Sequence, residues 1–219
     1  GFRNGQEPYS VTAASQFSDS ATNVENFHLT YFDDTFYSNQ PGSYIFLLGG
    51  NDTITLEGVS RYIIPGSGND VILADPILPS RLAYPEDNND PLGLRSAGIQ
   101  VQFTNASSGT VLNDGWGGVD TFTGVNAIEG SQFDDVMQGA DGSQSLFGNA
   151  GSDVLNGGAG DDYLDGGDGN DTLDGGNGTD EVLYYRETGP NGVNVNLETG
   201  QATDSHGNTD SLSNIERVY

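Results

Sequence analysis

The sequence contains no cysteine, which excludes disulfides, thiolate metal ligands and a cysteine nucleophile. Basic residues are also scarce: 6 Lys and Arg face 32 Asp and Glu, for a formal net charge of −26. A compact chain with that charge repels itself unless cations bind, and we expect no nucleic-acid partner. Since no stretch approaches the length of a membrane span, we expect no membrane insertion by this segment.

Motifs of common hydrolases are absent as well. Neither HExxH nor GxSxG occurs, and the only histidines, His28 and His206, are far apart in the sequence. Paired carboxylates could serve a glycosidase, but nearly all of them fall on one repeated position. We therefore expect no enzyme. At 34% hydrophobic and 10% aromatic residues, the chain is nevertheless too apolar for a disordered acidic tail.

What the sequence does contain is a glycine-rich repeat of nine residues. Consecutive units from Gly148 to Leu183 read GNAGSDVLN, GGAGDDYLD, GGDGNDTLD and GGNGTDEVL, and two weaker units extend the array back to Gly130. Position six of the array is occupied by Asp135, Gln144, Asp153, Asp162, Asp171 and Asp180. Position eight is always apolar: Met137, Leu146, Leu155, Leu164, Leu173 and Val182.

A weaker array near the N-terminus follows the same frame. Its eighth position is always apolar, but Asp appears at the sixth position only in alternate units, eighteen residues apart. If one coil of a solenoid consists of two nonapeptides, residues eighteen apart stack on one edge. The first array would then bind metal along one edge only. Its sixth positions are Asp34, Ser43, Asp52, Arg61 and Asp70.

The residue types indicate calcium chemistry. Glycine permits turns with positive φ and lets backbone carbonyls approach an ion. A three-residue strand after the Asp would point its middle side chain inward, and coils would stack at about 4.8 Å. Stacked carboxylates at that spacing need a cation. Ca²⁺ accepts 6–8 oxygens in flexible geometry, whereas Mg²⁺ demands a tighter octahedron, so we predict several Ca²⁺ ions.

The GGxGxDxUx units resemble the RTX (repeat-in-toxin, hemolysin-type calcium-binding) family. The resemblance implies a parallel β-roll in which Asp pairs eighteen apart bridge one ion, such as Asp153 with Asp171, Asp162 with Asp180, Asp135 with Asp153, Asp52 with Asp70 and Asp34 with Asp52. Gln144 weakens a site with Asp162, and we predict no ion at Ser43 or Arg61. The candidate ligands are Asp34, Asp52, Asp70, Asp135, Asp153, Asp162, Asp171 and Asp180, with turn glycines Gly50, Gly68, Gly151, Gly158, Gly160, Gly167, Gly169, Gly176 and Gly178.

A second, longer similarity surrounds the arrays. GIQVQF from Gly98 resembles GVNVNL from Gly192, and a tail beginning at Asp120 resembles one beginning at Asp210. The alternating segments predict half-buried strands. We predict an all-β fold, a calcium-stapled parallel β-roll in two blocks that short antiparallel segments separate and cap. The expected divisions are an N-terminal linker or cap strand (1–28), a first block (29–73), an insertion and strand-rich cap or linker (74–129), a second block (130–183) and a C-terminal strand-rich cap leading to a further block (184–219).

These expectations converge on a calcium-binding module of a secreted bacterial protein, which folds on meeting Ca²⁺; the RTX resemblance implies export by type I secretion. The alternative is a Ca²⁺-dependent adhesion module for a carbohydrate or protein, with Trp116 and Tyr84 as candidate sugar-stacking residues. We expect an extracellular monomer whose partners are Ca²⁺ and neighbouring RTX blocks of a toxin, adhesin or exoenzyme. Asp75-Pro76 and Asp90-Pro91, in the insertion 74–96, could be processing sites, although such dipeptides are ordinary in loops.

Overall fold

The computed structural model describes residues 26–42, 44–85, 95, 97–186 and 188–219. Over these residues the chain consists of strands and turns, with no helix and hence none that could cross a membrane. Ser43, Asp90-Pro91 and most of the predicted linker 1–28 lie outside the described residues.

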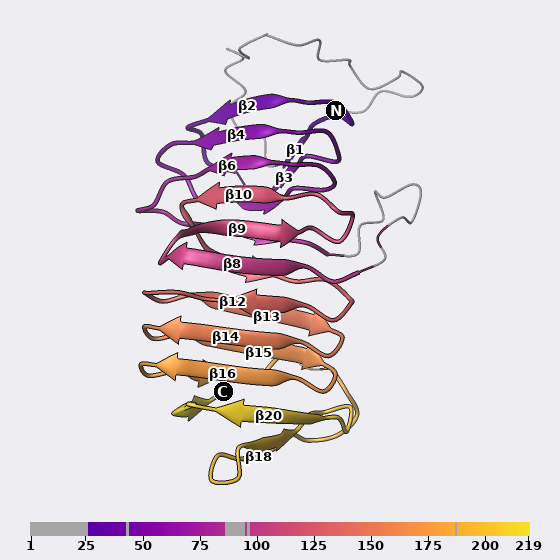
Figure 1. Cartoon of the computed structure of the whole chain (residues 1–219), viewed down its shortest axis with the longest axis vertical. Helices are drawn as coiled ribbons and strands as arrows, with labels where there is room; N and C mark the ends of the chain where they lie inside the picture. Colours follow the sequence, from indigo (N-terminus) through magenta and orange to yellow (C-terminus); the bar gives the residue numbers. More distant parts are fainter. Residues whose placement is uncertain (1–25, 43, 86–94, 96, 187) are drawn as a thin grey trace.

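The strands form two sheets that run the length of the molecule (Figure 1). The nine-stranded sheet has the order β1 (Asn26–His28), β3 (Tyr44–Phe46), β5 (Tyr62–Ile64), β7 (Ser80–Ala83), β11 (Val125–Glu129), β13 (Ser145–Ala150), β15 (Tyr163–Asp168), β17 (Glu181–Val182) and β21 (Arg217–Val218). The twelve-stranded sheet has the order β2 (Thr35–Ser38), β4 (Thr53–Leu56), β6 (Val71–Leu73), β10 (Asp120–Thr123), β9 (Ser108–Asn113), β8 (Gln100–Asn105), β12 (Val136–Gln138), β14 (Val154–Ala159), β16 (Thr172–Asn177), β20 (Thr209–Ser213), β19 (Gln201–Thr203) and β18 (Asn194–Asn196).

Pairing within the two arrays is parallel, with partners eighteen residues apart. Tyr44 pairs with Tyr62 in one sheet, and Thr35 pairs with Thr53 in the other. Each coil therefore contains two nonapeptides, one strand per sheet. This register confirms the predicted parallel β-roll.

The core lies between the sheets and is made by position eight of the repeat. Because side chains alternate along a strand, the middle residue of each three-residue strand points inward. From Ile45 to Ile72 and from Met137 to Val182, these side chains are at most 1% exposed. Phe36, on the first coil, is only partly buried and packs against this core. Position eight thus supplies one core side chain from each strand of the arrays, and β4 adds Leu56.

The two arrays belong to one continuous roll. In the nine-stranded sheet β7 pairs directly with β11, so that sheet is unbroken. In the other sheet, antiparallel β9 lies between β8 and β10 and joins the arrays (Figure 1). Segment 74–129, which we expect to be an insertion and a strand-rich cap or linker, lies inside the stack between the arrays. The reason is that β10 continues the parallel pairing of β6 while β8 continues that of β12.

Close approach of successive turns explains the glycines. A Cβ on Gly169 would lie 1.6 Å from the carbonyl oxygen of Gly151, the equivalent glycine one coil earlier, and its φ is +150°. Only glycine fits such a position. All nine candidate turn glycines have positive φ: Gly50, Gly68, Gly151, Gly158, Gly160, Gly167, Gly169, Gly176 and Gly178.

Candidate metal sites

The sixth-position residues of three edges, those that carry the candidate Asp ligands, form columns along the roll. The first column is Asp34, Asp52 and Asp70, and the second is Asp135, Asp153 and Asp171; both precede strands of the twelve-stranded sheet. The third is Gln144, Asp162 and Asp180, which precede strands of the nine-stranded sheet. The structure places every candidate Asp in one of these columns. Occupancy of the columns by ions stays a prediction.

Within a column, one carboxylate oxygen of each residue is used by the coil before it. The backbone N–H of Asp34 donates to Oδ1 of Asp52 at 2.7 Å, and that of Asp52 donates to Oδ1 of Asp70 at 2.8 Å. The same bond joins Asp135 to Asp153 (2.7 Å), Asp153 to Asp171 (2.9 Å), Gln144 to Asp162 (2.7 Å) and Asp162 to Asp180 (2.8 Å). This ladder fixes the orientation of each carboxylate.

The other oxygen is buried without a hydrogen-bond partner in six carboxylates. Among the described residues these are Oδ2 of Asp52, Asp70, Asp153, Asp162, Asp171 and Asp180. A buried carboxylate oxygen without a partner is costly, and a bound cation removes that cost. The six orphaned oxygens are the principal evidence for a metal-binding role.

The surroundings of these oxygens also fit a hard cation. A Cβ built on Gly148 would lie 2.1 Å from Oδ2 of Asp153 and 2.5 Å from the carbonyl oxygen of Gly166 on the next coil. At Gly157 the corresponding distances are 2.4 Å to Oδ2 of Asp162 and 2.7 Å to the carbonyl oxygen of Gly175. Carboxylate and carbonyl oxygens from successive coils therefore converge on one small space. Such an oxygen set suits Ca²⁺.

The columns pair carboxylates rather than cluster them. In the part of the chain that the structure describes, no three His, Cys, Asp or Glu side chains gather as a metal-binding group. The scheme predicted from the sequence already assigned the remaining ligands to backbone carbonyls.

Burial raises the pKa of the column carboxyls, because the protein interior solvates the charged form poorly. The pKa rises to about 8 at Asp153, where the neighbouring Asp135 and Asp171 add repulsion. The same cause raises the pKa to about 9 at Asp70 and to about 6 at Asp162. Burial raises the pKa of Asp52 and Asp171 to about 7, and it also raises the pKa of Asp135 and Asp180. Without bound cations, the three columns are therefore poorly suited to carry their full negative charge.

The opening residue of each column differs from those that follow. Oδ2 of Asp34 accepts hydrogen bonds from the backbone N–H and hydroxyl of Thr30, and Oδ2 of Asp135 accepts the N–H of Ser131. The amide of Gln144 donates to the carbonyl oxygens of Ala106 and Asp141, 3.4 and 3.3 Å away. Protein groups thus already contact the side chains that open each column.

Sequence reasoning missed three carboxylates that extend the columns. Glu216 extends the third column, because its Oε2 accepts the N–H of Asp180 at 2.8 Å, and two Asp residues extend the first two. The N–H of Asp70 donates to Oδ1 of Asp120, and the N–H of Asp171 donates to Oδ1 of Asp210. Both residues lie outside the nonapeptide frame. The available signal was the short motif Asp-x-apolar, with Phe122 and Leu212 two residues later as in the repeats.

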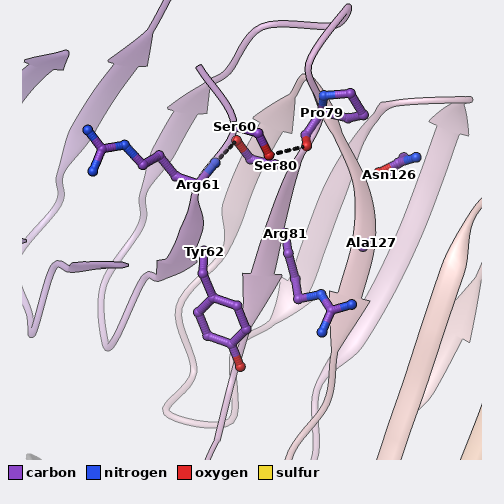
Figure 2. A pocket seen from close by; sticks show the side chains of 8 residues that line it. All are labelled: Ser60, Arg61, Tyr62, Pro79, Ser80, Arg81, Asn126 and Ala127. Carbon is purple, nitrogen blue, oxygen red and sulfur yellow. Dashed lines mark hydrogen bonds between the residues drawn. The ribbon is translucent and has the colours of Figure 1, made fainter. Parts of the chain in front are cut away.

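On the second edge of the first array, where no ion was predicted, other groups replace carboxylates. The N–H of Arg61 donates to the Ser80 hydroxyl at 3.0 Å, in place of a ladder carboxylate (Figure 2). The Arg61 side chain is buried, and Nη2 donates to Oγ of Ser38 at 3.2 Å and to the carbonyl oxygen of Gln40. The Arg61 guanidinium therefore contacts oxygens of the turn that follows β2.

An open hollow of about 360 Å³ lies beside this edge, lined by Ser60–Tyr62, Pro79–Arg81, Asn126 and Ala127. The Arg61 guanidinium extends away from Ser80, in a different direction from the Arg81 side chain (Figure 2). Arg81 is itself paired with Glu129 at 3.2 Å.

Residues weighed for other roles have structural contacts. His28 stacks on Phe46 with ring centroids 4.3 Å apart, whereas Nδ1 of His206 lies 2.7 Å from Asp168. The Arg95 guanidinium lies 4.5 Å from the centre of the Trp116 ring. Asp75, before Pro76, accepts hydrogen bonds from the N–H groups of Ile77 and Gly58.

A two-edged roll with glycine turns, a core built on position eight and carboxylate ladders defines a solenoid repeat protein. The comparison with protein families identifies the repeat: residues 147–182 match the RTX calcium-binding nonapeptide repeat in four copies. This segment, which includes four of the candidate Asp ligands, is therefore an RTX calcium-binding repeat block.

The comparison with curated proteins found no match. Among solved structures, the chain is similar to the extracellular lipase LipA from Serratia marcescens, with 16% identity and a TM-score of 0.25. The match covers 88% of this chain and 38% of the lipase chain, so this chain spans well under half of that protein's length. A TM-score of 0.25 does not establish a common fold.

Proposed function

We propose that this chain is a non-catalytic folding module of a secreted bacterial protein, in which binding of several Ca²⁺ ions drives formation of the roll outside the cell. The observation that supports it is the set of six buried carboxylate oxygens without partners. With a net charge of −26, the chain resists compaction where Ca²⁺ is scarce, as in the cytosol. Once ions bind, their binding free energy contributes to folding free energy.

In this role the protein's own residues hold and orient the ion ligands. The N–H ladder turns each Oδ1 toward the preceding coil, which leaves Oδ2 over its own turn. Turn glycines bring backbone carbonyls close to that oxygen. Bound Ca²⁺ supplies the positive charge that stacked carboxylates need. Because the chain carries RTX repeats, the proposal includes export by type I secretion.

Circular dichroism and equilibrium dialysis test the proposal. At about pH 8 we expect strand signal in millimolar Ca²⁺, its loss in a chelator, and several bound ions per chain. Mg²⁺ at the same concentration should restore little signal. A roll that is equally folded in chelator, with the same urea midpoint as in Ca²⁺, would contradict the proposed function.

A further inference from the structure

The first two columns each end on a carboxylate whose second oxygen is already satisfied. Oδ2 of Asp120 accepts the Tyr84 hydroxyl at 2.8 Å, and Oδ2 of Asp210 accepts the Tyr184 hydroxyl at 2.9 Å. We call Tyr84–Asp120 and Tyr184–Asp210 the closing pairs. Like the six carboxylates with an orphaned Oδ2, Asp120 and Asp210 accept a ladder N–H on Oδ1.

The closing pairs occupy equivalent places in the fold. Tyr84 follows β7 and Tyr184 follows β17, so both tyrosines come directly after strands of the nine-stranded sheet or one residue later. Each hydroxyl reaches an Asp at the first or second position of a strand of the other sheet, β10 or β20, with both partners at most 8% exposed. The sequence separations differ, 36 residues in one pair and 26 in the other. Two different connections thus produce the same contact.

We propose that the hydroxyls of Tyr84 and Tyr184 stand in for Ca²⁺, so that Asp120 and Asp210 hold no ion and the first two calcium columns end there. This inference rests on the proposed function, because it concerns where the calcium sites stop. A phenol O–H contributes the positive end of one dipole to a buried oxygen, as a cation does, but it brings no further ligands and no net charge. Each closing pair therefore makes a final rung whose carboxylate needs no metal.

Asparagine substitutions separate an ion ligand from a closed carboxylate. Asn keeps the oxygen that accepts the ladder N–H but loses the charge. We expect Asp171→Asn to lower the number of bound Ca²⁺ ions by at least one, as measured by equilibrium dialysis and native mass spectrometry. Asp210→Asn should bind as many ions as the wild-type chain. The same contrast should hold between Asp70→Asn and Asp120→Asn.

Phenylalanine substitutions test the hydroxyls. Tyr184→Phe and Tyr84→Phe leave a buried oxygen without a donor, so each should lower the urea midpoint in Ca²⁺ without loss of a bound ion. The matched control is Tyr37→Phe, because this exposed hydroxyl donates to a carboxylate of Glu57 at the surface, 2.9 Å away. The control should keep the wild-type midpoint. An additional ion bound to Tyr184→Phe would support the proposal directly, since it would occupy the freed oxygen.

Failure of this inference differs from failure of the proposed function. If Asp120→Asn and Asp210→Asn lose as many ions as Asp70→Asn and Asp171→Asn, the closing pairs are calcium sites and the inference is wrong. Closing-pair Phe variants with the midpoint of the Tyr37→Phe control would also overturn it. If the wild-type chain itself binds no Ca²⁺, the proposed function is wrong, and this inference with it.

Discussion

Replacing Asp153 with Asn should change stability in opposite directions with and without Ca²⁺. Without the ion, the ionised Asp153 is a buried charge beside two like neighbours, and the substitution removes it. In Ca²⁺, the same carboxylate is a proposed ligand, so its loss weakens an ion site. A residue that only packs the interior would shift stability in one direction in both buffers.

The size of the effect follows from the pKa of Asp153, which burial raises from 3.8 to about 8. At or above that pH, ionising Asp153 in the calcium-free roll costs up to about 6 kcal/mol relative to the unfolded chain. The new amide N–H without a partner takes back about 1–3 kcal/mol. We therefore expect a net gain of about 3–5 kcal/mol without calcium. In Ca²⁺ at a thousandfold excess over its dissociation constant, each lost ion costs about 4 kcal/mol. Because Asp153 is a proposed ligand of two ions, their loss outweighs the gain and the variant is less stable than the wild-type chain.

Urea titrations followed by circular dichroism at about pH 8, in Ca²⁺ and in chelator, measure both effects. Where the calcium-free wild-type chain has no folded baseline, a stabilising osmolyte present in all samples supplies one. Glu198→Gln, which removes an exposed carboxylate outside the columns, is the matched control and should have little effect in either buffer. Equal destabilisation by Asp153→Asn in both buffers would refute the reasoning from orphaned carboxylates.

Three further predictions use other parts of the roll. In calcium-free buffer the wild-type roll should gain stability as pH falls from about 8 to about 5. Burial raises the pKa of the column carboxyls in the folded chain, from about 6 at Asp162 to about 9 at Asp70, so their ionisation opposes folding above these values. Below about pH 4 the carboxyls are protonated in both the folded and the unfolded chain and this cost is absent; a urea midpoint independent of pH would contradict the prediction. Gly169→Ala should cost at least about 2 kcal/mol, since its φ is +150° and a Cβ would clash with Gly151, whereas Gly192→Ala, with open space around it, should be nearly neutral in the same urea assay. Arg61→Met should lower the free energy of unfolding by about 1–3 kcal/mol, equally in low and saturating Ca²⁺, because it removes donors to Ser38 and Gln40 rather than an ion ligand. A calcium-dependent change, or an effect as small as that of the exposed Arg217→Met, would count against it.

The stacking of the roll could be predicted because the repeat is local and strictly periodic. Nine residues set one turn and one strand, so the eighteen-residue register, the inward position eight and the edge for each Asp all follow from counting. Positive φ at the turn glycines follows in the same way. Tertiary context had little opportunity to override these patterns.

The rest depended on contacts that no period encodes. Asp120 aligns with Asp70 across 50 residues, and Asp210 aligns with Asp171 across 39, because antiparallel strands intervene between them in the chain. The hairpin containing β9 alternates apolar and polar residues, which predicts strands but not their place within the stack. The sequence suggests Tyr84 only as a candidate sugar-stacking residue, and the structure places its hydroxyl on Asp120.

The carboxylate ladder makes each coil of the roll polar. A coil offers carboxylate acceptors toward its N-terminal neighbour and backbone donors toward its C-terminal neighbour, as Asp52 does between Asp34 and Asp70. The two faces of a coil are therefore chemically different. Repeat blocks of this kind can therefore stack only head to tail, and two identical faces placed against each other would oppose carboxylate to carboxylate or leave donors without acceptors. Growth of the roll thus has a built-in direction along the chain.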